Sequence, residues 1–159
     1  MLKDHIRDYA TAAFRFWARE GGTVSVSGLD QFKRKIICEV EARQAEYIGG
    51  VRTYDIATPV EDWLLAQEKA YKRYSAEIAD LQAVDEVLRV SQYIHNGKMM
   101  RQALEIVYFA DAGRPMTKGD VEARVHRAEL TIPASYRTVY RLLNKARALF
   151  AENRGLRVS

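Results

Sequence analysis

The segment from residue 132 to 150, IPASYRTVYRLLNKARALF, combines arginine, lysine, asparagine and tyrosine side chains with a regular apolar spacing. At about 100° per residue, one arc of a helix is apolar and contains Val139, Leu142, Leu143, Ala146, Leu149 and Phe150. The opposite arc is polar and contains Tyr136, Arg137, Tyr140, Arg141, Asn144, Lys145 and Arg147. Ser135 stands where an N-cap belongs, because its hydroxyl can accept a bond from a first-turn amide and Pro133 disfavours helix across the junction. The pattern predicts a two-faced helix that begins near Ser135.

The polar arc has the chemistry that reads double-stranded DNA. In a helix-turn-helix unit, one helix lies across the DNA backbone and the next enters the major groove, where arginine pairs with guanine and asparagine with adenine. Arg137, Arg141 and Asn144 supply these groups from one face. The residues expected to contact phosphates are Ser135, Tyr136, Tyr140, Lys145 and Arg147 on this helix, and Thr117, Lys118 and Arg124 on the preceding one. The alternative is an ordinary surface helix with a solvated basic face.

Charge is distributed unevenly along the chain. Residues 98–159 contain 12 Lys or Arg against 6 Asp or Glu, a formal charge of +6, whereas residues 1–97 carry −2, which together make the net +4. A basic segment of this kind is typical of modules that bind a polyanion, although solubility alone would also explain it.

The elements expected around this helix are all α-helical. Apolar spacing predicts helices over about 6–20, 29–47, 58–94 and 98–110, and a short helix opened by a capping box of Thr117 and Asp120. The segment TVSVSGLD reads as a connector with a brief extended piece, and residues 129–134 as a second connector. We therefore expect an N-terminal helical region (1–57), a long central helix (58–97, opening at Thr58 and Pro59) and a C-terminal helix-turn-helix (98–159).

The central helix has a narrow apolar seam in steps of four and three residues, namely Val60, Leu64, Gln67, Tyr71, Tyr74, Ile78 and Leu81. A seam of this length needs a covering partner. The N-terminal helices of the same chain are the favoured partner, and the same helix of a second chain, which would form a homodimer, is the alternative.

The sequence offers little for catalysis or metal binding. His5, His95 and His126 share no ligand spacing, and Cys38, the only cysteine, is expected to be a packed thiol among apolar neighbours. Asp85 and Glu86 point in different directions from a helix and are expected on its solvated surface. Phosphate-loop and dinucleotide motifs are missing. We expect a protein that is not an enzyme and needs no cofactor or metal.

No apolar run approaches the roughly 18 to 20 residues that cross a bilayer, and the first twenty residues carry charges throughout instead of the apolar core of a signal peptide. A cytoplasmic protein without a membrane partner is therefore expected.

Three segments carry a family resemblance. ALEIVYFAD, TKGDVEARV and PASYRTVYRLLNKARALFAE are similar to the fourth region of bacterial sigma factors and, more closely, to the phage transcriptional regulators of the ArpU and RinA type. The resemblance covers roughly residues 81–153. The link over 129–134 departs from it, because it lacks the glycine of a tight turn and is longer than the usual three or four residues.

The resemblance implies a sequence-specific transcriptional regulator of phage or prophage origin that binds double-stranded DNA. Two other functions stay open. One is a DNA-packaging component like a phage terminase small subunit, and the other is a protein-interaction module that contacts RNA polymerase.

Overall fold

The structure, a computed structural model, describes residues 2–50 and 59–156. The elements are α1 (Asp4–Arg19), α2 (Gly28–Gly50), α3 (Pro59–Arg73), α4 (Ser75–Val90), α5 (Gly97–Leu104), the π-helical turn η1 (Glu105–Phe109), α6 (Lys118–Thr131) and α7 (Tyr136–Arg154). The only strand-like contact in the described residues is an isolated antiparallel bridge between Thr23 and Val26. The all-α prediction is confirmed, as is the brief extended piece in the first connector. None of the described helices is long and apolar enough to cross a membrane.

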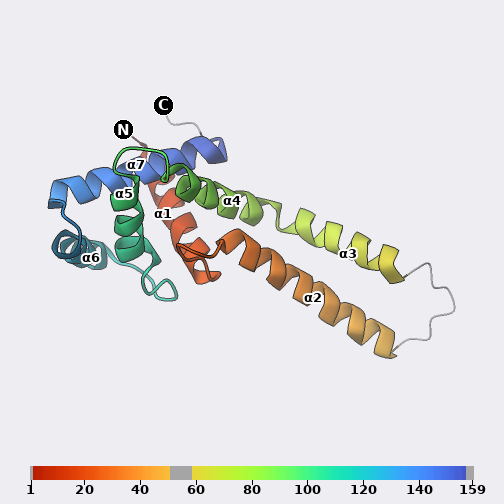
Figure 1. Ribbon diagram of the computed structural model, residues 1–159. Helices are drawn as coiled ribbons and strands as arrows, with labels where there is room; N and C mark the ends of the chain where they lie inside the picture. The colour runs from red at the N-terminus through yellow and green to blue at the C-terminus, as the bar shows by residue number, and fades with distance from the viewer. Residues whose placement is uncertain (1, 51–58, 157–159) are drawn as a thin grey trace.

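Helix α1 lies at the centre of the core, against α4, η1 and α7 (Figure 1). The Phe14 side chain is fully buried, and its ring centre lies 5.9 Å from that of Tyr108 and 5.8 Å from that of Phe150. Trp17 is buried beside it, 4.8 Å from Phe109 between ring centres. Each such aromatic contributes about 1.5 to 3 kcal/mol through burial of apolar surface. The packing therefore crosses the boundaries at 57/58 and 97/98 that the sequence suggests, and α1 shares one core with the C-terminal helices.

Helices α2 and α3 form an antiparallel hairpin that projects away from this core (Figure 1). Phe32, Ile36 and Val40 of α2 are buried on the side that faces the neighbouring helices. Cys38, expected to be a packed thiol, is instead exposed, because its position on the helix turns it away from that side. The cap expected at Thr58 lies outside the described residues.

The single long central helix predicted over 58–97 is wrong. The helix is interrupted at Tyr74 (φ −100°, ψ 22°), which separates α3 from α4, and α4 ends at Val90 instead of about residue 94. The Tyr74 ring packs edge-on against Phe32, with 5.7 Å between ring centres. The break lets α3 follow α2 while α4 enters the core with α1 and α7. The spacing of apolar residues does not predict this interruption, because it continues unchanged from α3 into α4.

The C-terminal elements also differ in detail from expectation. The predicted helix over 98–110 is α5 followed by η1, and a tight turn precedes it at Gly97, where a Cβ atom would lie 1.6 Å from the Ser91 carbonyl oxygen. Helix α6 runs through Thr131, because the N–H of the buried Ile132 still donates to Ala128 at 2.8 Å. The link to α7 is therefore residues 132–135, within the usual length for such turns.

Candidate nucleic-acid interface

Helix α7 begins and divides as its sequence predicts. The Ser135 hydroxyl accepts a hydrogen bond from the Thr138 N–H at 3.3 Å, which confirms it as the N-cap. The buried side chains of α7 are Val139, Leu142, Leu143, Ala146, Phe150 and Ala151. Because one face is occupied by the core, the opposite face alone is available to a partner.

Three basic side chains follow each other along the open face of α7. Arg137, Arg141 and Lys145 are all exposed and stand four residues apart, so they form one stripe that starts in the first turn. Guanidinium groups in such a stripe can donate two parallel hydrogen bonds to guanine or to a phosphate. We call these three residues the α7 stripe.

Asn144 and Arg147 lie beside the stripe and bind each other. The Arg147 guanidinium donates to the Asn144 side-chain oxygen, and Arg147 is half-buried. The Asn144 oxygen is therefore engaged within α7 in this structure, while its NH₂ group makes no hydrogen bond to the described residues. A base contact by Asn144 would require this pair to open or Asn144 to use its NH₂ group alone.

An aromatic cluster lies at the start of α7. The Tyr136 ring centre is 4.8 Å from that of Tyr140 and 5.8 Å from that of His126 on α6. Burial is the main cause that raises the pKa of Tyr140, so its hydroxyl stays protonated at neutral pH. A protonated phenol at this position can donate to a phosphate oxygen.

The N-terminus of α6 has the predicted capping box. The Thr117 hydroxyl accepts from the Asp120 N–H at 3.2 Å, and the Asp120 carboxylate accepts from the Thr117 N–H at 2.9 Å. The Asp120 carboxylate accepts from the Thr117 N–H and also from the Thr117 hydroxyl at 3.0 Å, and these bonds hold the pKa of Asp120 below its ordinary value. Lys118, the first residue of α6, is exposed.

Arg124, predicted as a phosphate contact, has a different task. Its guanidinium donates to the carbonyl oxygens of Val107 at 2.9 Å and Ala110 at 2.7 Å. These carbonyls lie where η1 ends, and helix ends leave carbonyls without partners inside the helix. Arg124 therefore fixes α6 to η1, and this geometry favours a structural role over phosphate contact.

Sequence reasoning missed a second arginine at the same place. Arg15 of α1 is 6% exposed and donates to the carbonyl oxygens of Tyr108 at 3.0 Å, Ala110 at 2.9 Å and Asp111 at 3.0 Å, and to that of Arg114. Helical spacing offered no signal for it, because Arg15 falls in the polar arc of α1 with Asp8 and Arg19, and only the loop over 108–114 covers it there. Arg15 thus holds the loop that leads into α6.

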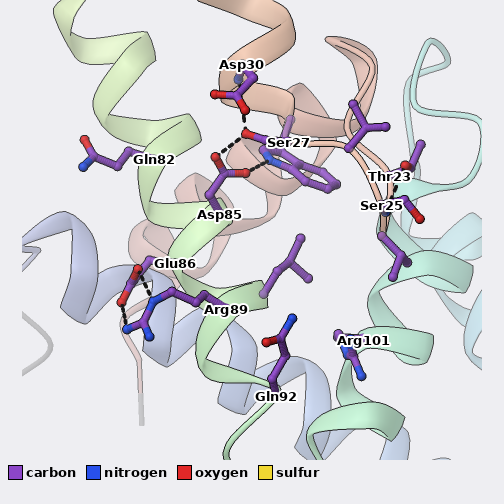
Figure 2. Close-up of a pocket in the computed structure, with 14 residues that line it drawn as sticks. Thr23, Ser25, Ser27, Asp30, Gln82, Asp85, Glu86, Arg89, Gln92 and Arg101 are labelled. Atoms are coloured by element: carbon purple, nitrogen blue, oxygen red, sulfur yellow. Dashed lines mark hydrogen bonds and ion pairs between the residues drawn. The ribbon is translucent and has the colours of Figure 1, made fainter.

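A separate cleft of about 420 Å³ lies between the first connector, α4 and α5 (Figure 2). Asp85 lines it and is not the solvated residue that its sequence context predicts, since its carboxylate accepts from Trp17 Nε1 at 2.8 Å and from the Ser27 hydroxyl. Burial raises the pKa of Asp85. Glu86 points elsewhere and pairs with Arg89 (Figure 2). Both Asp85 oxygens are used to join α1, the connector and α4, so the carboxylate is a structural link.

The predicted site residues therefore fall into three groups. The eight residues from Ser135 to Arg147 lie along α7, and Thr117 and Lys118 lie at the end of α6 that is away from the link, along a helix about 21 Å long at 1.5 Å per residue. Arg124 lies between them on α6, bound to the end of η1. No protein-family model matches the chain, and comparison with curated proteins and with solved structures found no match. Function is inferred from these residues themselves.

Proposed function

We propose that this chain binds double-stranded DNA through α6 and α7 and acts as a transcriptional regulator. The observation that supports this proposal most is the α7 stripe, in which Arg137, Arg141 and Lys145 are exposed on a helix whose other face is buried. An α-helix fits the major groove of B-form DNA, and its N-terminal part makes most base contacts. The stripe begins in the first turn of α7, where such contacts are made.

The relation of α6 to α7 also supports a helix-turn-helix. A four-residue link joins them, and in Figure 1 α6 is viewed nearly along its axis while α7 runs across the view, so the two helices cross steeply. In this arrangement the first helix meets the DNA backbone and the second enters the groove. Lys118, exposed at the N-terminus of α6, is placed to contact a phosphate.

The resemblance to ArpU- and RinA-type regulators adds a phage or prophage origin to this proposal, and its sigma-like part adds RNA polymerase as an alternative partner. The charged first twenty residues and the missing apolar run support a cytoplasmic location. A DNA-packaging role is the second candidate. It is favoured by the projecting α2/α3 hairpin, where Val60, Leu64 and Leu65 are 65%, 52% and 54% exposed, because packaging proteins of this kind join a DNA-binding unit to oligomerising helices. A ring-forming oligomer in light scattering would favour packaging over regulation.

The test is selection of bound sequences from a random DNA pool, followed by affinity measurements on Arg141→Ala. Arg141 lies near the middle of the α7 stripe, so its loss should lower affinity for the selected site by about 1 to 3 kcal/mol and relax preference at one base position. The affinities of wild type and of Arg141→Ala are each measured for the selected site and for scrambled DNA, at two salt concentrations.

Arg34→Ala is the matched control, because Arg34 is exposed on α2, which packs against α1, α3 and α4. It removes the same charge and should leave both affinities unchanged. If Arg141→Ala lowers both affinities equally, α7 acts only as an electrostatic surface. If it lowers neither, or if binding is insensitive to salt, the stripe serves a protein partner such as RNA polymerase.

A further inference from the structure

A second basic feature joins α1, from the half of the chain without net positive charge, to the loop that precedes α6. It is a cleft of about 460 Å³ between α1 and the loop that precedes α6. Arg15 and Arg19 of α1 and Arg114 of the loop line it, together with a single carboxylate, that of Asp8. We call it the arginine cleft.

The floor of the arginine cleft is rigidly held. Arg15 is buried, and its guanidinium donates hydrogen bonds to four backbone carbonyl oxygens within residues 108–114, one of which is that of Arg114. Arg19 and Arg114 are exposed at the rim. The Arg19 guanidinium lies 5.8 Å from the Phe16 ring centre, a contact that leaves its N–H groups available.

The charges around the cleft are predominantly positive where a ligand would enter. Burial, and then the nearby charges of Arg124 and Arg19, lower the pKa of Arg15, so Arg15 has a cation on each of these two neighbours. Asp111 and Asp120 act in the opposite direction on Arg15. The Asp120 carboxylate is already bound by the Thr117 N–H. An anion in the cleft would relieve the repulsion that Arg19 and Arg124 exert on Arg15.

The cleft also adjoins the proposed DNA-binding unit. Its lining includes Pro115 and Met116, which directly precede the N-cap of α6, and the exposed Lys118 follows one residue later. The N-terminus of a helix favours phosphate through its dipole and its free N–H groups. The arginine cleft therefore borders the loop that enters α6, close in sequence to the exposed Lys118, and in a helix-turn-helix this first helix is the one that meets the DNA backbone.

We propose that the arginine cleft binds a phosphate group of the DNA backbone, with Arg19 and Arg114 as its ligands and Arg15 as the residue that positions Arg114. The proposal rests on the proposed DNA-binding function and adds α1 to the interface. Contacts of this kind position the protein on the duplex without reading sequence. They should therefore affect all sequences alike.

The experiment compares the double variant Arg19→Ala/Arg114→Ala with wild type and with a matched control, Arg43→Ala/Arg73→Ala. The control removes two exposed arginines of the hairpin that line a different pocket, between α2 and α3. Binding of a labelled 25-base-pair duplex, selected or scrambled, is measured by fluorescence anisotropy over a series of salt concentrations. Thermal unfolding of each protein is measured in inorganic phosphate and in chloride at equal ionic strength, which separates free phosphate from the DNA backbone as ligand.

The cleft variant should lose affinity for both duplexes by roughly fivefold or more, and its plot of log K against log salt should become shallower by about 1 to 2. Sequence preference should be unchanged. If the cleft variant binds DNA like the hairpin control, the cleft does not contact DNA and the proposal is overturned.

If no form of the protein binds DNA, the proposed function fails separately. In that case, the melting temperatures decide whether the cleft is a phosphate site. If phosphate raises the melting temperature of wild type but not that of the cleft variant, the cleft binds free phosphate. Equal unfolding of both proteins in phosphate would overturn the site as well.

Discussion

Arg15→Met should destabilise the protein measurably, although the change keeps an apolar stem of similar length. The wild-type guanidinium is 6% exposed and donates to four backbone carbonyls between residues 108 and 114. Methionine can fill the path of the arginine stem but donates no hydrogen bond. The loop that enters α6 would then be attached to α1 by apolar contacts alone.

The size of the effect follows from where the four acceptors lie. A hydrogen bond from a charged group contributes about 1.5 to 3 kcal/mol when the acceptor is shielded from water. The bond to the Tyr108 carbonyl is buried, whereas the other three acceptors are partly exposed and can bind water after the change. Removing a buried charge also returns part of its desolvation cost. We expect a loss of about 2 to 4 kcal/mol in the free energy of unfolding.

The assay is urea unfolding followed by circular dichroism, with Arg15→Lys and Arg124→Met as companion variants. Lysine keeps the charge but cannot bridge four carbonyls with one ammonium group, so its loss should be intermediate. Because Arg15 and Arg124 both donate to the Ala110 carbonyl, the double variant Arg15→Met/Arg124→Met should not show additive losses. A loss below about 0.5 kcal/mol for Arg15→Met would refute the reasoning, since it would mean that these bonds contribute nothing net.

Two further predictions concern Asp85 and the hairpin. Burial raises the pKa of Asp85 above its ordinary value of 3.8. The folded protein therefore holds the carboxyl proton of Asp85 more tightly than the unfolded chain does. As pH rises above 3.8 and the carboxyl group ionises, the free energy of unfolding falls. Asp85→Asn, which can still bond Trp17 and Ser27, should therefore gain stability relative to wild type between about pH 4 and about pH 7, as measured by urea unfolding at both values; a constant difference between the two proteins would contradict this. For the hairpin, Leu64→Lys should abolish self-association seen by sedimentation, because Leu64 is 52% exposed at the outer end of the seam. If the wild-type protein is a monomer at high micromolar concentration, self-association through the seam is refuted and the seam packs only within one chain.

Features decided by neighbours in the chain could be predicted from the sequence. The N-cap of α7 at Ser135 and the capping box of Thr117 and Asp120 depend on side chains that reach amides three residues away, and both are confirmed. The two faces of α7 follow from helical spacing in the same way. The α7 stripe was thus visible before the fold was known, because which residues share a helix face is a local property.

Features decided by distant segments could not be predicted in this way. Asp85 accepts a hydrogen bond from Trp17, which is 68 residues away in the chain. The interruption at Tyr74 arises because α3 packs on α2 whereas α4 packs on α1 and α7, and one continuous apolar seam does not distinguish these partners. Arg124 was expected to be available to phosphate, but the end of η1 supplies carbonyls that bind it first.

Local spacing alone determined that the chain is helical, the caps at Thr117 and Ser135 and the basic face of α7. Tertiary structure alone decided that α1 belongs to the same core and that Arg15 and Arg124 meet at the Ala110 carbonyl, 95 and 14 residues away in the chain. The physical reason is that a backbone carbonyl is present in every residue and leaves no mark in the sequence. Only the folded chain selects which carbonyls a buried arginine will bind.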